Sequence, residues 1–137
     1  MYTLIKKKMI KAPIDGNIIL LQDVPDPAFA KGMLGEGIAI CPSNTCVIAP
    51  CSGVISVIAN TKHAIGITGD DGVEILIHLG IDTAILNGKG FELLVHTGDI
   101  ITTGTALINL DLELINNHHK PFIVPVIICN HHFFFFF

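Results

Sequence analysis

The chain has 137 residues and a mass of 14.7 kDa; 50% of the residues are hydrophobic, 15% are charged, and the mean hydropathy is +0.64. This length suits one domain that buries about two-thirds of the surface of its unfolded chain, and the composition excludes an intrinsically disordered protein. A net charge of −4 excludes a large basic surface for nucleic acid, and no hydrophobic run approaches the roughly 20 residues of a membrane-crossing helix.

Short runs of β-branched and apolar residues recur along the chain, separated by Gly, Pro, Asp and Asn. One helical turn is predicted at 26–34, with Asp26 as its cap and Pro27 at its first position, and a second short helix at 111–117. This pattern predicts an all-β sandwich or barrel with one or two short helical turns. The predicted strands are 18–21, 37–40, 54–58, 64–67, 73–77, 106–110 and 122–129.

A short repeat links two of these strands. The pattern A-P-x-x-G-x-I occurs at 12–18 and again at 49–55, and we expect both copies to begin equivalent strands. A third segment, 98–107, reads as turn, strand and turn, with the strand at Ile100 and Ile101. We expect one domain over 1–137, with 1–9 as an N-terminal extension.

The two ends of the chain and its cysteines carry separate expectations. The first twelve residues contain four lysines but no apolar core or cleavage site, so they do not form a secretory signal. The cysteines show no CxxC spacing, and we expect reduced thiols in the cytoplasm rather than the two disulfides of a secreted chain. The tail at 131–137 ends in five Phe, an aggregation hazard if exposed, and we treat it as non-native or disordered. The four cysteines are Cys41, Cys46, Cys51 and Cys129.

The most informative stretch places two histidines near one another. Two strand-like runs flank a Gly- and Asp-rich segment at 69–72, which is typical of a β-hairpin. A two-residue turn at 70–71 would bring His63 directly opposite His78, and a register shift of two would make them diagonal neighbours. Thr61 shares their face by the period of two. The pattern predicts one Thr and two His on one sheet face, and a slip of one residue would separate them.

Two neutral imidazoles side by side have several chemical uses. They can pass protons, bind a metal, or let one ring attack an electrophile while the other stabilises the product. The plainer alternative is a pair of core histidines bonded to backbone. The residues alone leave these alternatives open.

Several segments resemble the glucose-type IIA component of the bacterial phosphoenolpyruvate-dependent sugar phosphotransferase system, from about residue 10 to residue 130. The most specific is G-V-E-I-L-I-H-L-G-I-D-T at 72–83; T-K-H-A-I-G-I at 61–67 and V-P-D-P-A-F-A at 24–30 come in the family's order. The resemblance implies an antiparallel β-sandwich of the duplicated hybrid type, which agrees with the repeat.

The resemblance also implies roles for individual residues. His78, in H-x-G-x-D-T, resembles the histidine that is phosphorylated, and His63, in T-x-H-A, resembles the second histidine, which holds the phosphoryl group unmodified. Thr61 resembles the hydroxyl that orients His63. In this family the phosphocarrier protein HPr donates the phosphoryl group and a cysteine of a IIB domain accepts it during coupled sugar uptake. No cofactor is implied, contact with the membrane comes only through the permease, and regulatory target proteins stay open.

A docking surface for these partners is expected beside the histidines. It combines an apolar side with two carboxylates that match family positions facing a basic residue of HPr. For Met33 and Leu34 the alternative is a place in the core. The expected partner-binding residues are Asp26, Phe29, Met33, Leu34, Leu76 and Asp82.

Other protein classes fit the sequence less well. A zinc endopeptidase of the lysostaphin type would need an H-x-H pair, which the sequence lacks. A biotinyl or lipoyl carrier would need an acceptor Lys in an M-K-M or D-K-A setting, and Lys62 and Lys89 do not have these neighbours. A zinc-binding hydrolase of another kind, or a structural β-domain with a non-catalytic His pair, is the remaining alternative. In one regulatory complex of the family the two histidines share zinc with a partner, but two His alone leave the coordination incomplete, so we expect no metal in the isolated protein.

Overall fold

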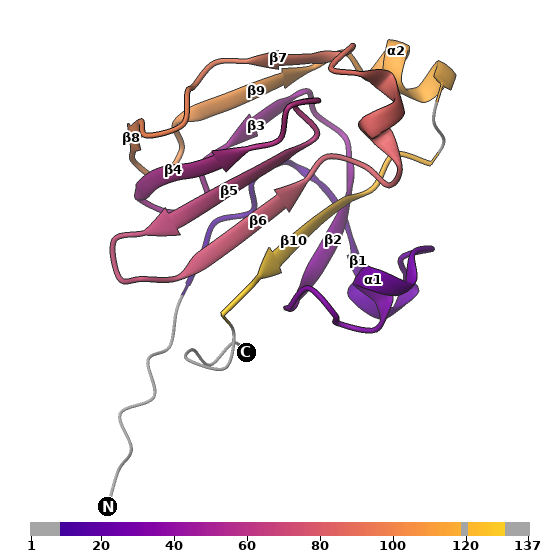
Figure 1. Cartoon of the computed structure of the whole chain (residues 1–137). Coiled ribbons are helices and arrows are strands. Elements are labelled where there is room, and N and C mark those ends of the chain that lie inside the picture. The colour runs from indigo at the N-terminus through magenta and orange to yellow at the C-terminus, as the bar shows by residue number, and fades with distance from the viewer. Residues whose placement is uncertain (1–8, 119–120, 131–137) are drawn as a thin grey trace, which may run out of the picture.

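The computed structural model describes residues 9–118 and 121–130; all but Met9 of the expected extension, and the whole tail at 131–137, lie outside this part of the chain. Two antiparallel sheets pack against each other (Figure 1), with strand orders β1-β2-β10-β6-β5-β4-β8 and β3-β9-β7. The strands are β1 (Gly16–Leu20), β2 (Glu36–Pro42), β3 (Cys46–Ile48), β4 (Gly53–Ile58), β5 (Ala64–Gly69), β6 (Glu74–His78), β7 (Phe91–Leu93), β8 (Ile100–Ile101), β9 (Ala106–Leu110) and β10 (Val124–Ile128).

The predicted all-β sandwich is confirmed, and the seven-stranded sheet is open, with β1 and β8 as its edges. All seven predicted strand segments form strands, and so does the pair Ile100–Ile101. Strands β3 and β7 were not predicted, because three residues are too few to show an alternating pattern. The short helices are α1 (Pro27–Ala30) and α2 (Leu112–His118), and the 3-10 turns are η1 (Leu21–Asp23) and η2 (Thr83–Leu86).

The main core fills the space between the two sheets. Along β5 and β6 the inward side chains are isoleucines that pair across the strands, Ile65 with Ile77 and Ile67 with Ile75. They meet fully buried residues of the smaller sheet, including Leu107 of β9. This alternation fixes which residues of β6 face outward, because neighbouring side chains in a strand point to opposite faces.

A second, smaller core covers the outer face of the large sheet. Its centre is Phe29 of α1, which packs with Ala39 of β2 and Ile127 of β10. The Asp26 carboxylate accepts a hydrogen bond from the Ala28 amide (2.9 Å) and so caps the helix, as predicted. The helix is shorter than the predicted 26–34, because the chain leaves it at Gly32 with φ +68°. Through Phe29 of this one-turn helix, the second core reaches the edge of the histidine site.

Both copies of the repeat begin a strand at their glycine, as predicted. Gly16 starts β1 and Gly53 starts β4. A Cβ at either position would lie 2.1 Å from a carbonyl oxygen of the paired strand, that of Cys41 or of Thr68. The glycine of the pattern therefore permits the same close approach of two strands at two places in the large sheet.

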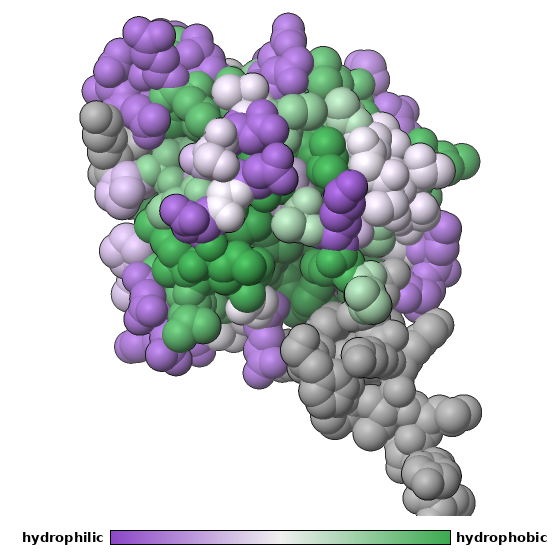
Figure 2. Space-filling model, turned by 180° about the vertical axis from the view of Figure 1, so that it is seen from behind, coloured by the Kyte–Doolittle hydropathy of each residue, from purple (hydrophilic) through white to green (hydrophobic). Residues whose placement is uncertain are grey.

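Some hydrophobic residues remain at the surface; on the face shown in Figure 2 they gather in broad areas between hydrophilic residues. Ile18, Met33 and Ile100 are 68%, 71% and 86% exposed. Within 9–118 and 121–130, no helix has the length and apolar character needed to cross a bilayer.

Candidate functional site

His78 lies at the end of β6, on the outer face of the large sheet. It follows Ile77, which points into the main core, so alternation turns the imidazole outward, and the ring is half-buried. Its strand neighbour across β5 is Ala64. The small side chain of Ala64 leaves room above the sheet for the ring.

A backbone carbonyl fixes the tautomer of His78. Nδ1 lies 2.5 Å from the carbonyl oxygen of Gly80, and because a carbonyl only accepts, Nδ1 carries the proton and donates it. Nε2 is therefore the ring nitrogen with a lone pair. Gly80 has φ +93°, a backbone conformation that favours glycine, and this turn brings its carbonyl back to the ring.

The turn after His78 is itself held in place. The Thr83 side chain is fully buried, and its hydroxyl donates a hydrogen bond to the Leu79 carbonyl. A Cβ at Gly80 would lie 2.3 Å from Cγ2 of Thr83 and 2.8 Å from the ring of Phe122. The H-x-G-x-D-T spacing thus corresponds to a packed turn, in which any larger residue at Gly80 would have to displace Thr83 or Phe122.

His63 and Thr61 reach the site from the segment before β5. The ring centroids of His63 and His78 are 5.1 Å apart, with an interplanar angle of 77°. The Thr61 hydroxyl lies 2.5 Å from Nδ1 of His63. With Thr61 as the donor, the proton of the neutral His63 ring sits on Nε2. The predicted cluster of one threonine and two histidines is present.

The predicted hairpin register is wrong by one residue. The turn is longer than the expected pair 70–71: the Gly69 amide donates to the Val73 carbonyl (2.7 Å), and β6 pairs His78 with Ala64 instead of His63. This slip does not separate the histidines, contrary to our expectation, because His63 precedes β5 and follows Lys62, whose φ is +62°. Because Lys62 has a left-handed backbone, the direction of the His63 side chain does not follow the alternation of β5.

Both imidazoles are biased towards the neutral form. The pKa of His78 is lowered chiefly by burial and further by its neighbour His63, while the Gly80 carbonyl and the carboxylates of Asp26 and Asp82 oppose this shift. Burial also lowers the pKa of His63. At neutral pH both rings are uncharged, and Nε2 of His78 keeps its lone pair.

The expected docking residues divide into exposed and buried ones. Met33 is 71% and Leu34 43% exposed, so the alternative that they belong to the core is wrong. Leu76 is half-buried on the histidine face. Phe29 is only 4% exposed, and its ring packs against His78 with centroids 5.0 Å apart. It therefore presents little surface to a partner.

The two expected carboxylates both act on His78 through their charge. Asp26 does so while its carboxylate caps α1, as expected; its contact with HPr stays a prediction. Asp82 is exposed in a left-handed conformation (φ +58°) at the start of η2. Both carboxylates raise the pKa of His78, although burial outweighs them.

Residues 8–134 match the model of the family described as phosphoenolpyruvate-dependent sugar phosphotransferase system, EIIA 1. The chain belongs to this family. As an EIIA component it is a phosphoryl carrier in sugar transport and a phosphotransferase component. The alternative of a zinc-binding hydrolase or structural domain is not supported.

Individual relatives agree with this assignment. The glucose-specific EIIA component of Staphylococcus epidermidis is 46% identical over 121 residues, covering 88% of this chain and 73% of that protein. The component of Staphylococcus aureus is 46% identical over 117 residues, covering 85% and 70%. The solved glucose permease IIA from Mycoplasma capricolum superposes with a TM-score of 0.87 at 39% identity, covering 95% of this chain and 84% of that one.

Sequence reasoning missed two contributors to this EIIA site. Gly80 and Thr83 stand in the motif that marked His78, but their roles depend on a carbonyl direction and a buried hydroxyl. The H-x-G-x-D-T spacing was the available signal, since a glycine two residues after a functional histidine points to a tight turn. The contact between Phe29 and His78 had no such signal.

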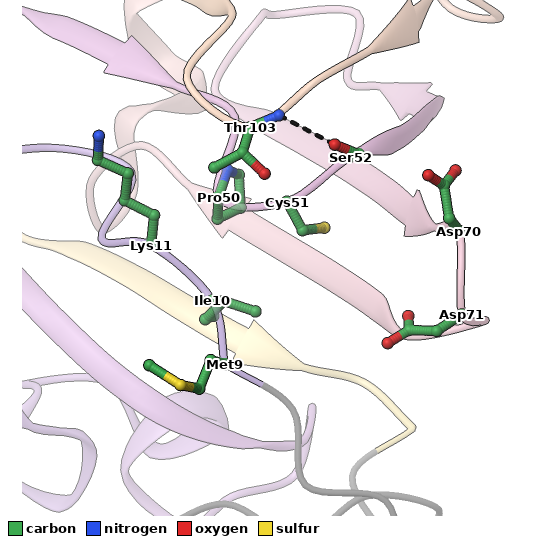
Figure 3. Close-up of a pocket in the computed structure, with 9 residues that line it drawn as sticks. All are labelled: Met9, Ile10, Lys11, Pro50, Cys51, Ser52, Asp70, Asp71 and Thr103. Atoms are coloured by element: carbon green, nitrogen blue, oxygen red, sulfur yellow. Dashed lines mark hydrogen bonds between the residues drawn. The ribbon is translucent and has the colours of Figure 1, made fainter.

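Two cavities of the EIIA domain have linings that include neither His63 nor His78. One of about 430 Å³ sits by the turn of the β5–β6 hairpin, where Asp70 and Asp71 line it and the Thr103 amide donates to the Ser52 hydroxyl (3.2 Å; Figure 3). His78 lies at the other end of β6. A groove of about 840 Å³ is lined by Ile38 and Val126, which lie on the inner face of the large sheet. Among the described residues, no group of three or more His, Cys, Asp or Glu could hold a metal ion.

Proposed function

We propose that Nε2 of His78 accepts the phosphoryl group from phospho-HPr and passes it to a cysteine of a IIB domain of a sugar permease. The observation that carries the proposal is the hydrogen bond from Nδ1 to the Gly80 carbonyl, which leaves Nε2 as the nucleophilic nitrogen. The lowered pKa of His78 supports it, because a protonated ring could not attack phosphorus.

The two transfers balance without loss of a proton. In the first, the Nε2 lone pair of His78 bonds to phosphorus as the P–N bond to the histidine of HPr breaks, and that histidine leaves with the electron pair. In the second, the thiolate of the IIB cysteine bonds to phosphorus, the bond to His78 breaks, and its electron pair returns to Nε2. Little covalent chemistry falls to the protein, so positioning and charge stabilisation dominate.

His63 supplies the charge stabilisation in this scheme. Its ring stands beside that of His78 at 5.1 Å between centroids, and Thr61 binds its Nδ1. With Nδ1 accepting from Thr61, the Nε2–H of His63 donates to an oxygen of the phosphoryl group. Thr61 thereby acts as an orienting residue, and His63 as a donor that is not itself modified.

The partners are proposed from the family and the surface. Met33 and Leu34 offer exposed apolar contacts, while Asp26 and Asp82 offer charges that suit a basic residue of HPr. The relatives are named as glucose-specific components, so glucose uptake is the first transport activity to test. We place this relay in the cytoplasm, and we expect the isolated domain to work without metal or cofactor.

Intact mass after incubation with phosphoenolpyruvate, enzyme I and HPr tests the proposal. The wild type should gain one acid-labile phosphoryl group, His78→Ala should gain none, and His63→Gln should gain one but transfer it slowly to a IIB domain. His96→Ala is the matched control, because His96 is an exposed histidine whose ring lies 3.8 Å from the Asp99 carboxylate, in a different part of the chain from the His63–His78 pair. A phosphoryl group on folded His78→Ala, or none on the wild type, would overturn the proposal.

A further inference from the structure

The imidazole of His78 is held from three directions. Gly80 fixes one nitrogen through its carbonyl, and His63 stands against the ring at an interplanar angle of 77°. The third neighbour is Phe29, whose ring meets that of His78 at a centroid distance of 5.0 Å and an angle of 62°. This is the edge-to-face geometry that aromatic pairs prefer.

Phe29 is held in place by the second core and by its helix. It is 4% exposed and belongs to the second core with Ala39, Ile81 and Ile127. Its backbone is fixed in α1, where the Phe29 amide donates to the Asp26 carbonyl (3.1 Å). Because the Phe29 ring is fixed by the second core, it offers the His78 imidazole a surface that does not move away.

We propose that Phe29 is a positioning residue for His78: its ring limits rotation of the imidazole about χ2 and so keeps Nε2 directed to the outside. The proposal rests on the role of His78 given above. It assigns Phe29 to the phosphoryl-transfer step, whereas the sequence suggested a contact with partner proteins.

The physical need for such a restraint follows from the imidazole torsion. The χ2 torsion of histidine is broad and roughly two-fold, and a half-turn puts Cδ2 where Nδ1 stood and Cε1 where Nε2 stood, which breaks the hydrogen bond to Gly80. The single hydrogen bond to Gly80 opposes that half-turn, but a hydrogen bond contributes little net stability where water can compete for the donor. Packing by Phe29 keeps water from one side of the ring, which strengthens the hydrogen bond to Gly80, and it hinders the intermediate orientations that the imidazole must pass through to turn over.

Phe29→Leu is the direct test, because leucine keeps the site apolar and removes the ring. The matched control is Phe91→Leu, since Phe91 is also 4% exposed but lies in β7 of the smaller sheet. Met33→Gln serves as the reference for a docking defect, because Met33 is exposed. Each folded variant is measured for the kcat and KM of phosphorylation by phospho-HPr, and for the ¹⁵N shifts of His78 without phosphorylation.

We expect Phe29→Leu to lower kcat roughly three- to tenfold, with little change in KM. Its ¹⁵N shifts should show a smaller fraction of His78 with the proton on Nδ1. Phe91→Leu should change neither quantity, and Met33→Gln should raise KM alone. A raised KM with unchanged kcat for Phe29→Leu, or tautomer shifts identical to those of Phe91→Leu, would overturn the proposal.

The two measurements separate this inference from the proposed function. If the wild type accepts no phosphoryl group, the proposed function fails, and the positioning role in phosphoryl transfer fails with it. The tautomer comparison needs no phosphorylation and still decides whether Phe29 orients the ring. If the wild type is phosphorylated and Phe29→Leu behaves like Phe91→Leu in both measurements, only the inference about Phe29 fails.

Discussion

Nδ1 of His78 donates a hydrogen bond to the carbonyl of Gly80, two residues further along the chain. The contact is local in sequence, yet it depends on distant parts of the fold: Gly80 keeps φ +93° in a turn packed against Phe122. The chemical character of the histidine is therefore set by the backbone of its own motif.

Gly80→Ala should damage both stability and phosphoryl transfer. A Cβ there would lie 2.3 Å from Thr83 and 2.8 Å from Phe122, in addition to the cost of a positive φ. We expect a loss of roughly 2–4 kcal/mol in the free energy of unfolding, measured by urea denaturation. Gly98→Ala is the control, because Gly98 has φ +92° but nothing within 4 Å of the added carbon; it should lose only about 1 kcal/mol. Equal losses would contradict the packing argument.

Stability should fall as the pH drops below the ordinary histidine pKa. Burial lowers the pKa of His78 in the folded protein from 6.5, so below that pH the unfolded chain binds protons that the folded protein does not. The contribution of His78 is complete above about pH 6.5 and is lost as the pH falls towards its lowered folded pKa, and His63 acts in the same direction. Urea denaturation between about pH 8 and pH 5 should show this slope. The slope of the unfolding free energy against pH should be shallower in His78→Gln. An unchanged slope would show that His78 does not cause the pH dependence.

Removal of the two carboxylates near His78 should slow the reaction with HPr in a salt-dependent way. Asp26→Asn combined with Asp82→Asn should reduce kcat/KM for phospho-HPr more at low than at high ionic strength, because salt screens the attraction to a basic partner. Asp70→Asn combined with Glu113→Gln removes the same charge elsewhere on the surface and should have a smaller effect. Equal slowing at both salt concentrations would contradict the electrostatic role.

Thr61→Val should impair onward transfer more than phosphorylation. The change removes the hydroxyl that binds Nδ1 of His63 while keeping a similar shape, so the His63 tautomer is no longer fixed. The loss of one hydrogen bond corresponds to a roughly two- to tenfold slower transfer to a IIB domain. Thr61→Ser keeps the hydroxyl and should restore most of the rate. Failure of serine to rescue would assign the effect to packing instead.

The sequence predicted the site better than it predicted the path of the backbone. The hairpin pattern brought the two histidines together, as the structure does, but it did so with a register that is wrong by one residue. His63 lies before β5, outside strand alternation, and neither the turn length nor the left-handed Lys62 is visible in a hydrophobic pattern. The helical turn after Asp26 was predicted, whereas its docking over the outer face was not. The burial of Phe29 followed from that docking, so its contact with His78 could not be foreseen.

His63 directly precedes β5 and His78 ends β6, the two strands that the turn at 70–72 joins. The Leu79 amide donates to the His63 carbonyl (2.6 Å) at the open end of this hairpin. The turn lies at the far end of the hairpin from the chemistry. A protein split there would place the nucleophile on one fragment and its helper on the other. Recovery of phosphoryl transfer on mixing would then report that the fragments had reassembled, which makes this small domain suitable as a complementation sensor.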